Sequence, residues 1–375
     1  MTVSAGAGRT GDSPRVALTV EQLWQAVPGG SGTYIVELAA ALAAAGTDVV
    51  GLAAAHRGQP PADLRPGVPV RHAPLPRRVL YDAWNRLGLP RAEHLDRRAD
   101  VVHATTWAIP PTRRPLVVTV HDVAFLRDPG HFTPRGVQFF TRALERTRAE
   151  AHVVVVPSEA TALDCIEAGI ERERIDVVPH GVRVHAPDDA AVAAFRSARG
   201  LERPYVLWTG TREPRKNLAG LLAAFARVPA TDVDLVLVGP AGWGEVADVP
   251  ADVRARVHHV GRLPWDELQL AYAGARAFCF PSLWEGFGMP VLEAMAHGVP
   301  VVTSVGTSMA EVAGGAALLV DPRDPDELAA ALARAVGPDH DTLAEAGRAV
   351  ADRATWAGAA ARTLAAYANA AERHH

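Results

Sequence analysis

The sequence predicts an α/β protein of two domains, each built on a parallel β-sheet with helices on both faces. Three observations support this fold class. Short apolar runs alternate with helical segments along most of the chain, which is the pattern of parallel sheets. The chain has 375 residues, enough for two domains of about 150 residues each. Hydrophobic residues make up 49% of the chain, enough for two sizeable cores.

The first half of the chain contains six predicted strands and three long predicted helices. The strands are expected at 15–20, 48–52, 100–103, 116–120, 153–156 and 175–178. The helices are expected at 34–45, 134–150 and 159–169, with Ser158 as the N-cap of the last one. A linker at about 183–203 follows, and we place the domain boundary between residues 195 and 196.

The second half repeats this alternation. Strands are expected at 205–209, 233–238, 257–260, 277–280, 299–303 and 316–320. Helices are expected after Asn217 as far as 227, and at 265–272, 290–297, 324–336, 340–353 and 356–373.

The stretch 277–303 carries the strongest functional pattern, because it predicts a strand, a glycine loop, a helix and a further strand. Gly286 and Gly288 lie in the loop, and the helix N-terminus that follows offers unpaired N–H groups to an anion. Glu285 and Glu293 bracket this site. Glu293 also suits the helix dipole, whereas Glu285 has no such structural reason. Amides aimed at a diphosphate, with two carboxylates for sugar hydroxyls, would form a nucleotide-sugar site.

A second candidate loop lies at 210–217, between the strand 205–209 and a helix. Lys216 in this loop is the only lysine of the chain, which otherwise uses 37 arginines as its basic residues. This suggests a specific need for an ammonium group. Arg212 and Arg215 are both candidates for a second cation beside it. A solvated helix start with incidental basic residues is the structural alternative.

Two features of the first domain are typical of ligand sites in α/β proteins. A glycine-rich stretch at 28–33, which includes Gly30 and Gly32, follows the first strand and precedes a helix. It is not a G-x-G-x-x-G motif, so a dinucleotide-binding enzyme is disfavoured. His121 follows the strand 116–120, and ligands of α/β sheets bind beyond the carboxyl ends of the strands. Asp122 is expected to orient His121 or to cap a turn.

The charge and composition of the chain exclude several classes of protein. The formal charge of −4 gives no signature of nucleic-acid binding. Cys165 and Cys279 have no CxxC partner, so neither a disulfide framework nor a zinc site is expected. An Asp-x-Asp string at 232–234 falls at the start of a strand, the wrong end for a metal site. No signal peptide or membrane-spanning run is evident, so we expect a cytoplasmic protein, and a position at the inner face of the membrane stays open.

The segment 71–148 differs from the rest because it has a formal charge of +7 and carries aromatic residues. Such a surface could contact anionic lipid or a lipid-linked acceptor. A solvated face or an ordinary aromatic core cluster is the alternative explanation.

The string from Glu285 to Glu293 resembles the E-x7-E motif of retaining glycosyltransferases of family four, which have the two-domain GT-B fold. The resemblance extends over nearly the whole chain and is greatest to bacterial polysaccharide and mannosyl transferases. It includes the strand that ends in His121 and a Pro-Asn-Gly-Val linker motif that has His180 in place of Asn. It implies that the donor binds to the domain 196–355, the acceptor meets the domain 1–195, and helix 356–373 packs back on the first domain.

The resemblance also implies roles for individual residues. Glu293 would accept hydrogen bonds from the ribose, and Glu285 from the transferred hexose. Arg212 and Lys216 would hold the diphosphate and stabilise the charge of the leaving group. The remaining donor-binding residues would be the first-domain glycines Gly30 and Gly32, the loop glycine Gly286, and the amides of Phe287, Gly288 and Met289. His121 would approach the donor sugar.

The function that follows is transfer of a hexose, with mannose favoured, from a nucleoside-diphosphate sugar to a glycan, lipid-linked or small-molecule acceptor. No metal or other cofactor is expected. Front-face transfer is preferred over a covalent intermediate on Glu285, but the sequence leaves both open. Two alternatives also stay open: a hydrolysing sugar-nucleotide epimerase of GT-B fold, and a non-catalytic nucleotide-sugar-binding subunit.

Overall fold

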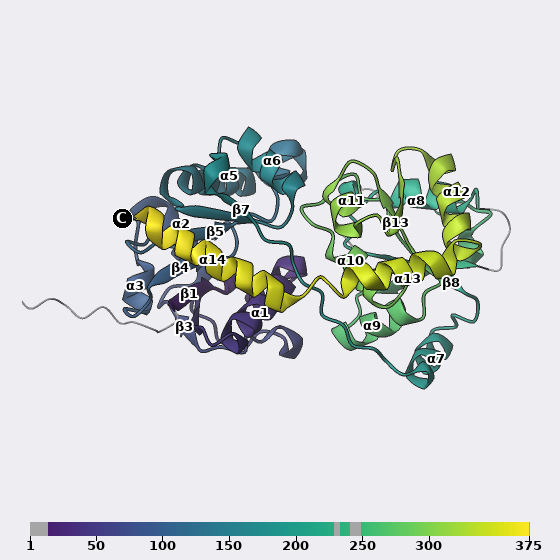
Figure 1. Ribbon diagram of the computed structural model, residues 1–375, viewed down its shortest axis with the longest axis horizontal. Helices are drawn as coiled ribbons and strands as arrows, with labels where there is room; N and C mark the ends of the chain where they lie inside the picture. The colour runs from purple at the N-terminus through teal and green to yellow at the C-terminus, as the bar shows by residue number, and fades with distance from the viewer. Residues whose placement is uncertain (1–13, 229–232, 241–248, 375) are drawn as a thin grey trace, which may run out of the picture.

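The computed structural model describes residues 14–228, 233–240 and 249–374, which form two α/β domains lying side by side (Figure 1). Each domain contains one parallel sheet. The strand order is β3-β2-β1-β4-β5-β6-β7 in the first sheet and β10-β9-β8-β11-β12-β13 in the second. In both sheets the order reverses beside the domain's first strand, and such switch points are where α/β sheets bind ligands.

The strands of the first sheet are β1 Arg15–Thr19, β2 Asp48–Ala53, β3 Val70–His72, β4 Val101–Ala104, β5 Leu116–Thr119, β6 Val153–Val156 and β7 Ile175–Val177. The strands of the second sheet are β8 Tyr205–Thr209, β9 Asp234–Val238, β10 Val257–Gly261, β11 Ala277–Phe280, β12 Val301–Ser304 and β13 Ala317–Val320.

The helices are divided between the two sheets. On the first domain lie α1 Gly29–Ala44, α2 Arg77–Leu87, α3 Ala92–Leu95, α4 Ala124–Arg127, α5 Pro134–Glu150, α6 Glu159–Glu167 and α14 Trp356–His374. On the second lie α7 Asp189–Ala198, α8 Leu218–Phe225, α9 Trp265–Ala273, α10 Met289–Ala296, α11 Ser308–Ala313, α12 Pro325–Val336 and α13 His340–Ala351. Short 3₁₀ helices include η1 Glu21–Trp24 and η5 Pro214–Lys216.

The apolar strands form because both faces of each sheet are buried. In β1, Val16 and Leu18 lie in the core cluster shared with α1 and α14, while Ala17 lies in the cluster shared with α5 and α6. Successive side chains of a strand point to opposite faces, so a strand covered on both faces must be apolar throughout.

The structure corrects several details of the prediction. The glycine stretch at 28–33 is the first turn of α1, not a loop. Helix α7 lies inside the predicted linker and packs on α9, so the second domain begins near Asp189 and the predicted boundary at 195 cuts through a helix. The short strand β3 and the helices α2, α3, α4 and α11 were not predicted.

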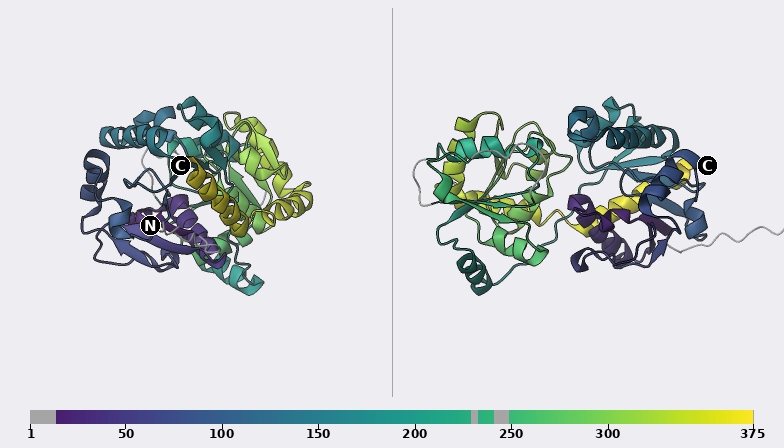
Figure 2. Two further views of the ribbon diagram at one scale, coloured as in Figure 1. Left: turned by 60° about the vertical axis from the view of Figure 1, so that its left-hand side comes forward. Right: turned by 180° about the vertical axis from the view of Figure 1, so that it is seen from behind.

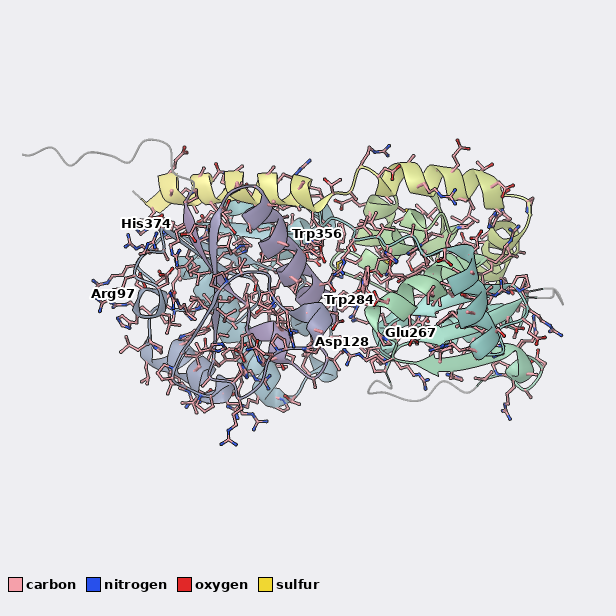
Figure 3. All side chains as sticks on the ribbon, turned by 90° about the horizontal axis from the view of Figure 1, so that it is seen from below. Arg97, Asp128, Glu267, Trp284, Trp356 and His374 are labelled. Atoms are coloured by element: carbon pink, nitrogen blue, oxygen red, sulfur yellow. The ribbon has the colours of Figure 1, made fainter. Side chains whose placement is uncertain are left out.

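Two segments join the domains, one before α7 and one before α14. Helix α14 runs along the first domain and packs on α1, as the views in Figures 1 and 2 agree. The two segments touch: the Val182 N–H donates to the Ala354 carbonyl at 2.9 Å. A Cβ on Gly181 would lie 2.3 Å from the Trp356 nitrogen, so the backbones approach closely. Figure 3 shows α13 and α14 along one side of both domains, with Trp356 at the junction.

Within the described residues, no helix combines the length and the apolar character needed to cross a bilayer.

Candidate active site

The loop 281–288 follows the carboxyl end of β11 and leads into α10. Two buried serines fix its backbone: Ser304 Oγ donates to the Ser282 carbonyl and Ser308 Oγ to the Glu285 carbonyl, both at 2.6 Å. The Leu283 N–H donates to the Arg215 carbonyl at 2.8 Å, which ties this loop to η5 after β8. The two candidate loops of the second domain therefore form one unit.

Glu285 and Lys216, predicted separately, form an ion pair at the centre of this unit. Lys216 Nζ lies 2.6 Å from Glu285 Oε1, and Arg215 Nη1 lies 2.5 Å from Glu285 Oε2. The Glu285 side chain is only 10% exposed. Arg215 is held from the other side by Glu213, with Nε and Oε2 at 2.9 Å. One carboxylate thus positions two cations at the carboxyl edge of the second sheet.

Burial and charge oppose each other at these groups. Burial favours a raised pKa for Glu285, but the charges of Lys216 and Arg215 outweigh it and hold the pKa below its ordinary value. Burial lowers the pKa of Arg215, but Glu285 and Glu213 outweigh that effect and raise it. The site is therefore an ionised carboxylate between two cations.

Arg212, which sequence reasoning preferred over Arg215, lies elsewhere. Its guanidinium donates to His259 Nδ1 on β10 at 3.0 Å. Arg215 lies within the 3₁₀ helix η5, which begins after Arg212, and its guanidinium reaches Glu285. In this structure the cation paired with Lys216 is Arg215.

Glu293 lies on α10, and Tyr272 Oη donates to its Oε2 at 2.8 Å. Burial raises the pKa of Glu293. Beside it is a narrow space of about 10 Å³ with walls from both domains, including Thr33 and Arg183. Glu293 thus lies where the two domains meet, apart from the ion pairs of Glu285.

The glycines of the predicted site are points of close approach between the domains. A Cβ on Gly286 would lie 1.8 Å from the His121 carbonyl oxygen, and a Cβ on Gly30 would lie 2.6 Å from Met289 Cε. Gly32 differs, since its Cβ would meet Pro28 of its own helix at 2.6 Å. At Gly286 the absence of a side chain therefore allows a close contact between the backbones of the two domains.

The remaining residues of the loop lie at the start of α10. Gly288 is the N-cap with φ of +96°, a conformation that favours glycine. Phe287 is buried, and its ring lies 4.8 Å from the ring of His180 in the linker between the domains. The helix N-terminus that the sequence assigned to a diphosphate therefore borders the linker between the domains, which we call the hinge.

The same loop is bound to the N-terminus of α6 in the first domain. Ser158 Oγ and Thr161 Oγ1 donate to the Gly286 carbonyl at 2.7 and 2.9 Å. The Glu311 carboxylate accepts from the Glu159 N–H at 3.0 Å. Ser158 is the predicted N-cap of α6, and it also holds the second domain in place.

His121 follows β5 at the carboxyl edge of the first sheet. Its Nε2 donates to the Thr105 carbonyl at 3.0 Å, and its ring lies edge-on to Tyr34 with 4.8 Å between the centroids. Burial lowers the pKa of His121, which favours the neutral imidazole. Asp122 accepts from the Ala124 N–H at 2.9 Å, so it caps a turn.

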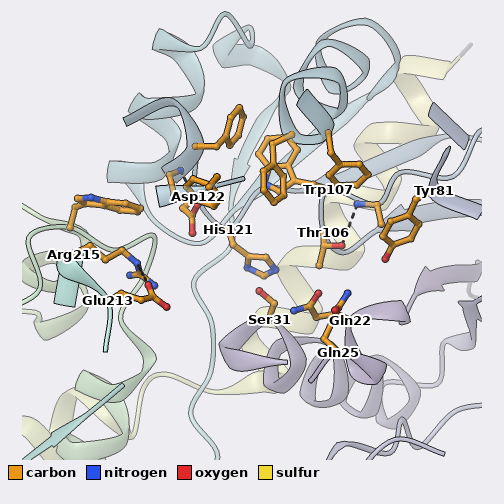
Figure 4. Close-up of a pocket in the computed structure, with 17 residues that line it drawn as sticks. Gln22, Gln25, Ser31, Tyr81, Thr106, Trp107, His121, Asp122, Glu213 and Arg215 are labelled. Carbon is orange, nitrogen blue, oxygen red and sulfur yellow. Dashed lines mark hydrogen bonds and ion pairs between the residues drawn. The ribbon is translucent and has the colours of Figure 1, made fainter. Parts of the chain in front are cut away.

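A cavity of about 470 Å³ lies between His121 of the first domain and Arg215 of the second (Figure 4). Sequence reasoning missed several of its lining residues, namely Gln22, Gln25, Ser31, Thr106, Trp107, Glu213 and Trp284. Thr106 and Trp107 follow β4 at the carboxyl edge, so the rule that identified His121 could have found them too.

Among the described residues, no group of three or more His, Cys, Asp and Glu side chains is placed to hold a metal ion. Asp234 of the Asp-x-Asp string pairs with His258 at 2.8 Å, and Asp232 lies outside the described residues.

Comparisons with known proteins show the family of the chain. Residues 28–186 match the family described as Glycosyltransferase Family 4, and residues 203–338 match Glycosyl transferases group 1. The chain is 30% identical to the MMP alpha-(1->4)-mannosyltransferase of Mycolicibacterium hassiacum, over 92% of this chain and 96% of that protein. It is 29% identical to the O-antigen chain mannosyltransferase B of Escherichia coli, over 71% of this chain and 74% of that protein.

A third relative is the D-inositol 3-phosphate glycosyltransferase of Streptosporangium roseum, 32% identical over 92% of this chain and 90% of that protein. Two solved structures share the fold at 20% identity. Anabaena HepE, in complex with UDP and glucose, has a TM-score of 0.72 over 94% of this chain and 99% of that chain. WaaG, a glycosyltransferase involved in lipopolysaccharide biosynthesis, has a TM-score of 0.70 over 93% and 98%.

The GT-B fold predicted from the sequence is thus confirmed, and the protein is a glycosyltransferase. The chain belongs to glycosyltransferase family 4.

Proposed function

We propose that this enzyme transfers a hexose, with mannose favoured, from a nucleoside-diphosphate sugar to a glycan, lipid-linked or small-molecule acceptor, with retention of configuration. The observation that carries the proposal is the placement of the Glu285–Lys216–Arg215 cluster. Arg215 of this cluster lies opposite His121 in the lining of a cavity of about 470 Å³ that has walls from both domains, and Glu285 and Lys216 lie directly behind Arg215.

The donor is proposed to bind to the second domain. Lys216 and Arg215 would hold the diphosphate, because fixed cations stabilise the negative charge that builds on the leaving group. The amides of Phe287, Gly288 and Met289 would assist at the N-terminus of α10. The hydroxyls of the ribose would bind Glu293. Since cations and a helix terminus neutralise the charge, no metal ion is required.

Glu285 is proposed to position the hexose rather than to attack it. Both of its carboxylate oxygens are within 2.6 Å of a cation. Such pairing lowers the pKa of Glu285 and weakens it as a nucleophile. This supports front-face transfer, in which the leaving phosphate takes the proton of the acceptor hydroxyl. His121, neutral and fixed by Thr105, would contact the donor sugar from the first domain.

The identity of the sugar is proposed from relatives. Two of the relatives are named as mannosyltransferases, and one as a glycosyltransferase of D-inositol 3-phosphate. The acceptor is proposed to enter through the first-domain side of the cavity. A lipid-linked acceptor would bring the basic segment 71–148 to the inner face of the membrane.

The first test is thermal-shift screening against GDP, UDP, ADP and dTDP, with and without Mg²⁺. A ligand at a hundredfold excess over its Kd stabilises the folded state by about 3 kcal/mol, which is readily detected. We expect one diphosphate to stabilise the protein without metal. Products formed from the matching donor alone would indicate an epimerase, and donor binding without transfer to any acceptor would indicate a silent subunit. No shift with any diphosphate would contradict the proposed donor site.

A further inference from the structure

A second cavity, of about 570 Å³, adjoins the first and lies between α2 and α5 of the first domain. Its lining is strongly basic, with five arginines and a single acid: Arg77, Arg78, Arg86, Arg135, Arg142 and Asp82. The two cavities share Gln25, Tyr81 and Phe139 as walls. A ligand that begins beside His121 would have to pass these three side chains to reach the basic cavity.

The charge of this second cavity is not balanced by the protein. Arg135 is paired with Asp82, with Nη2 and Oδ2 at 3.0 Å. The described part of the chain offers no ion-pair partner to the other four arginines. Like charges gathered in one concave surface repel each other, and an anion bound among them relieves the repulsion. Guanidinium groups also match phosphate oxygens in a bidentate geometry, so a phosphate is the anion that fits best.

We propose that the basic cavity binds a phosphate group carried by the acceptor, while the acceptor hydroxyl lies beside His121 in the adjoining cavity. The inference rests on the glycosyl transfer proposed above and names the chemical class of its acceptor. The donor diphosphate is a poor occupant of this cavity, because its cations Lys216 and Arg215 lie on the second domain and the basic cavity is built from the first domain alone.

The wall between the two cavities also suits a sugar acceptor. Tyr81 and Phe139 stack with their ring centroids 5.6 Å apart, and both rings border both cavities. Aromatic faces bury the apolar face of a sugar ring. The phosphate could belong to a soluble sugar phosphate or to a lipid headgroup. Val79 and Leu87, beside the arginines on α2, are 51% and 73% exposed, so the experiment must separate these two sources.

The test uses Arg78→Gln/Arg142→Gln, which removes one cation from each helix, and Arg57→Gln/Arg97→Gln as a control on exposed arginines outside the cavity. The proteins are first saturated with the nucleoside diphosphate that gives the largest thermal shift, so that the donor site is filled. Inorganic phosphate is then titrated by calorimetry. In parallel, each protein is sedimented with vesicles of phosphatidylcholine, with and without phosphatidylglycerol.

We expect Arg78→Gln/Arg142→Gln to weaken phosphate binding about tenfold or more, since each charge-assisted contact contributes strongly to affinity. The control should bind phosphate as the wild type does. If instead only the phosphatidylglycerol vesicles bind, and this binding is lost in Arg78→Gln/Arg142→Gln, the phosphate is that of a lipid headgroup. Equal behaviour of both double variants and the wild type in both assays would overturn the proposal.

The thermal shift produced by the nucleoside diphosphate shows whether the basic-cavity proposal or the proposed function has failed. Both double variants should keep the wild-type thermal shift, because their substitutions lie on the first domain and the proposed donor site lies on the second. A normal shift without phosphate or vesicle binding overturns the basic-cavity proposal alone. A missing shift in the wild type contradicts the donor site itself.

Discussion

At the scale of single residues, Glu285 has two tasks. Its carboxylate holds Lys216 and Arg215 in place, and in the proposed mechanism it also accepts hydrogen bonds from the hexose. We expect Glu285→Gln to reduce turnover about 10²-fold, because the hexose loses the charged acceptor that positions its reacting carbon. Steady-state transfer and equilibrium nucleotide binding, measured on the same preparation, separate the two tasks.

The control for this substitution is Glu345→Gln, on an exposed position of α13. It removes one carboxylate from the surface and should leave turnover unchanged. If Glu285→Gln retained normal turnover together with donor binding, the positioning role would be wrong. If it lost nucleotide binding as well, the main task of Glu285 would be to organise the two cations.

Glu293 shows a conflict between stability and binding. Burial raises its pKa, so at neutral pH the folded state holds an ionised carboxylate in an unfavourable place. The stability that this group contributes is present below its unfolded pKa and is lost as the pH rises through the folded pKa. Glu293→Gln removes that loss, and its amide oxygen can still accept from Tyr272. We therefore expect a higher Tm than wild type at pH 7 and a smaller difference in acid.

The same substitution should weaken nucleotide binding about tenfold or more, because a hydrogen bond to a charged group contributes about 1.5–3 kcal/mol. Thermal unfolding at two pH values and a nucleotide titration check both effects. An unchanged Tm would show that the ionised Glu293 carboxylate does not destabilise the folded state. An unchanged affinity would show that Glu293 does not bind the ribose.

At the scale of elements, the loop 281–288 and the N-terminus of α6 join the domains. The Gly286 carbonyl accepts from Ser158 and Thr161, and its Cα faces the His121 carbonyl. Because a Cβ at this position would lie 1.8 Å from that oxygen, Gly286→Ala must separate the two domains locally. We expect about a 10²-fold loss of transfer, since the groups on opposite sides of the cavity would be misplaced.

Gly67→Ala is the matched control, because a Cβ there meets no atom within 4 Å. Solution X-ray scattering should show a larger radius of gyration for Gly286→Ala than for Gly67→Ala, with both variants fully folded by circular dichroism. Wild-type activity and dimensions in Gly286→Ala would mean that the contact between the two domains is not needed for transfer.

The strands and helices also show how much of the fold could be predicted from the sequence. Strands such as β5 and β11 are apolar on both faces, and this pattern needs no knowledge of their neighbours. The predicted start of α1 was too late because glycines disfavour a helix locally, whereas the helix begins at Gly29. Neighbouring side chains at Gly30 and Gly32 leave no room for a Cβ, and the local sequence does not reveal this. Helix α11 was missed because its six residues are too few for a period to be recognised.

The residues of the candidate site that could be predicted are those that stand in a continuous sequence motif. Glu285 and Lys216 each stand in such a motif, and the structure brings them together. The choice of Arg215 over Arg212 depends on the turn η5, whose direction a short sequence does not reveal. The lining of the cavity depends on how the domains face each other, which arises from contacts between residues more than 100 positions apart, such as Ser158 and Gly286.

At the scale of the whole molecule, helix α14 connects the hinge to the interior of the first domain. Trp356 begins the helix at the junction, and Tyr367 shares a hydrogen bond of 2.8 Å with His103 Nδ1. His103 in turn contacts Thr119, and Thr119 contacts Tyr34, whose ring lies beside His121. A buried polar network thus extends from the C-terminal helix to the candidate active site.

Buried histidines in both domains make the whole molecule sensitive to acid. Burial lowers the pKa of His103 in the first domain to about 3 and that of His297 in the second to about 4. Between these values and the ordinary pKa of 6.5, the unfolded chain binds more protons than the folded one. The free energy of unfolding must therefore fall as the pH falls from 7 to 5, and both domains must contribute to the fall.

His297→Gln tests this account in the second domain, since an amide can replace the contact of His297 with Gln269 but cannot titrate. A histidine that stays neutral when folded should lose about 2 kcal/mol of stability between pH 7 and pH 5. Urea unfolding at the two pH values should show that His297→Gln loses about this much less than the wild type does. An equal loss in both proteins would mean that His297 becomes protonated without unfolding, and the acid sensitivity would then lie in the first domain and the hinge.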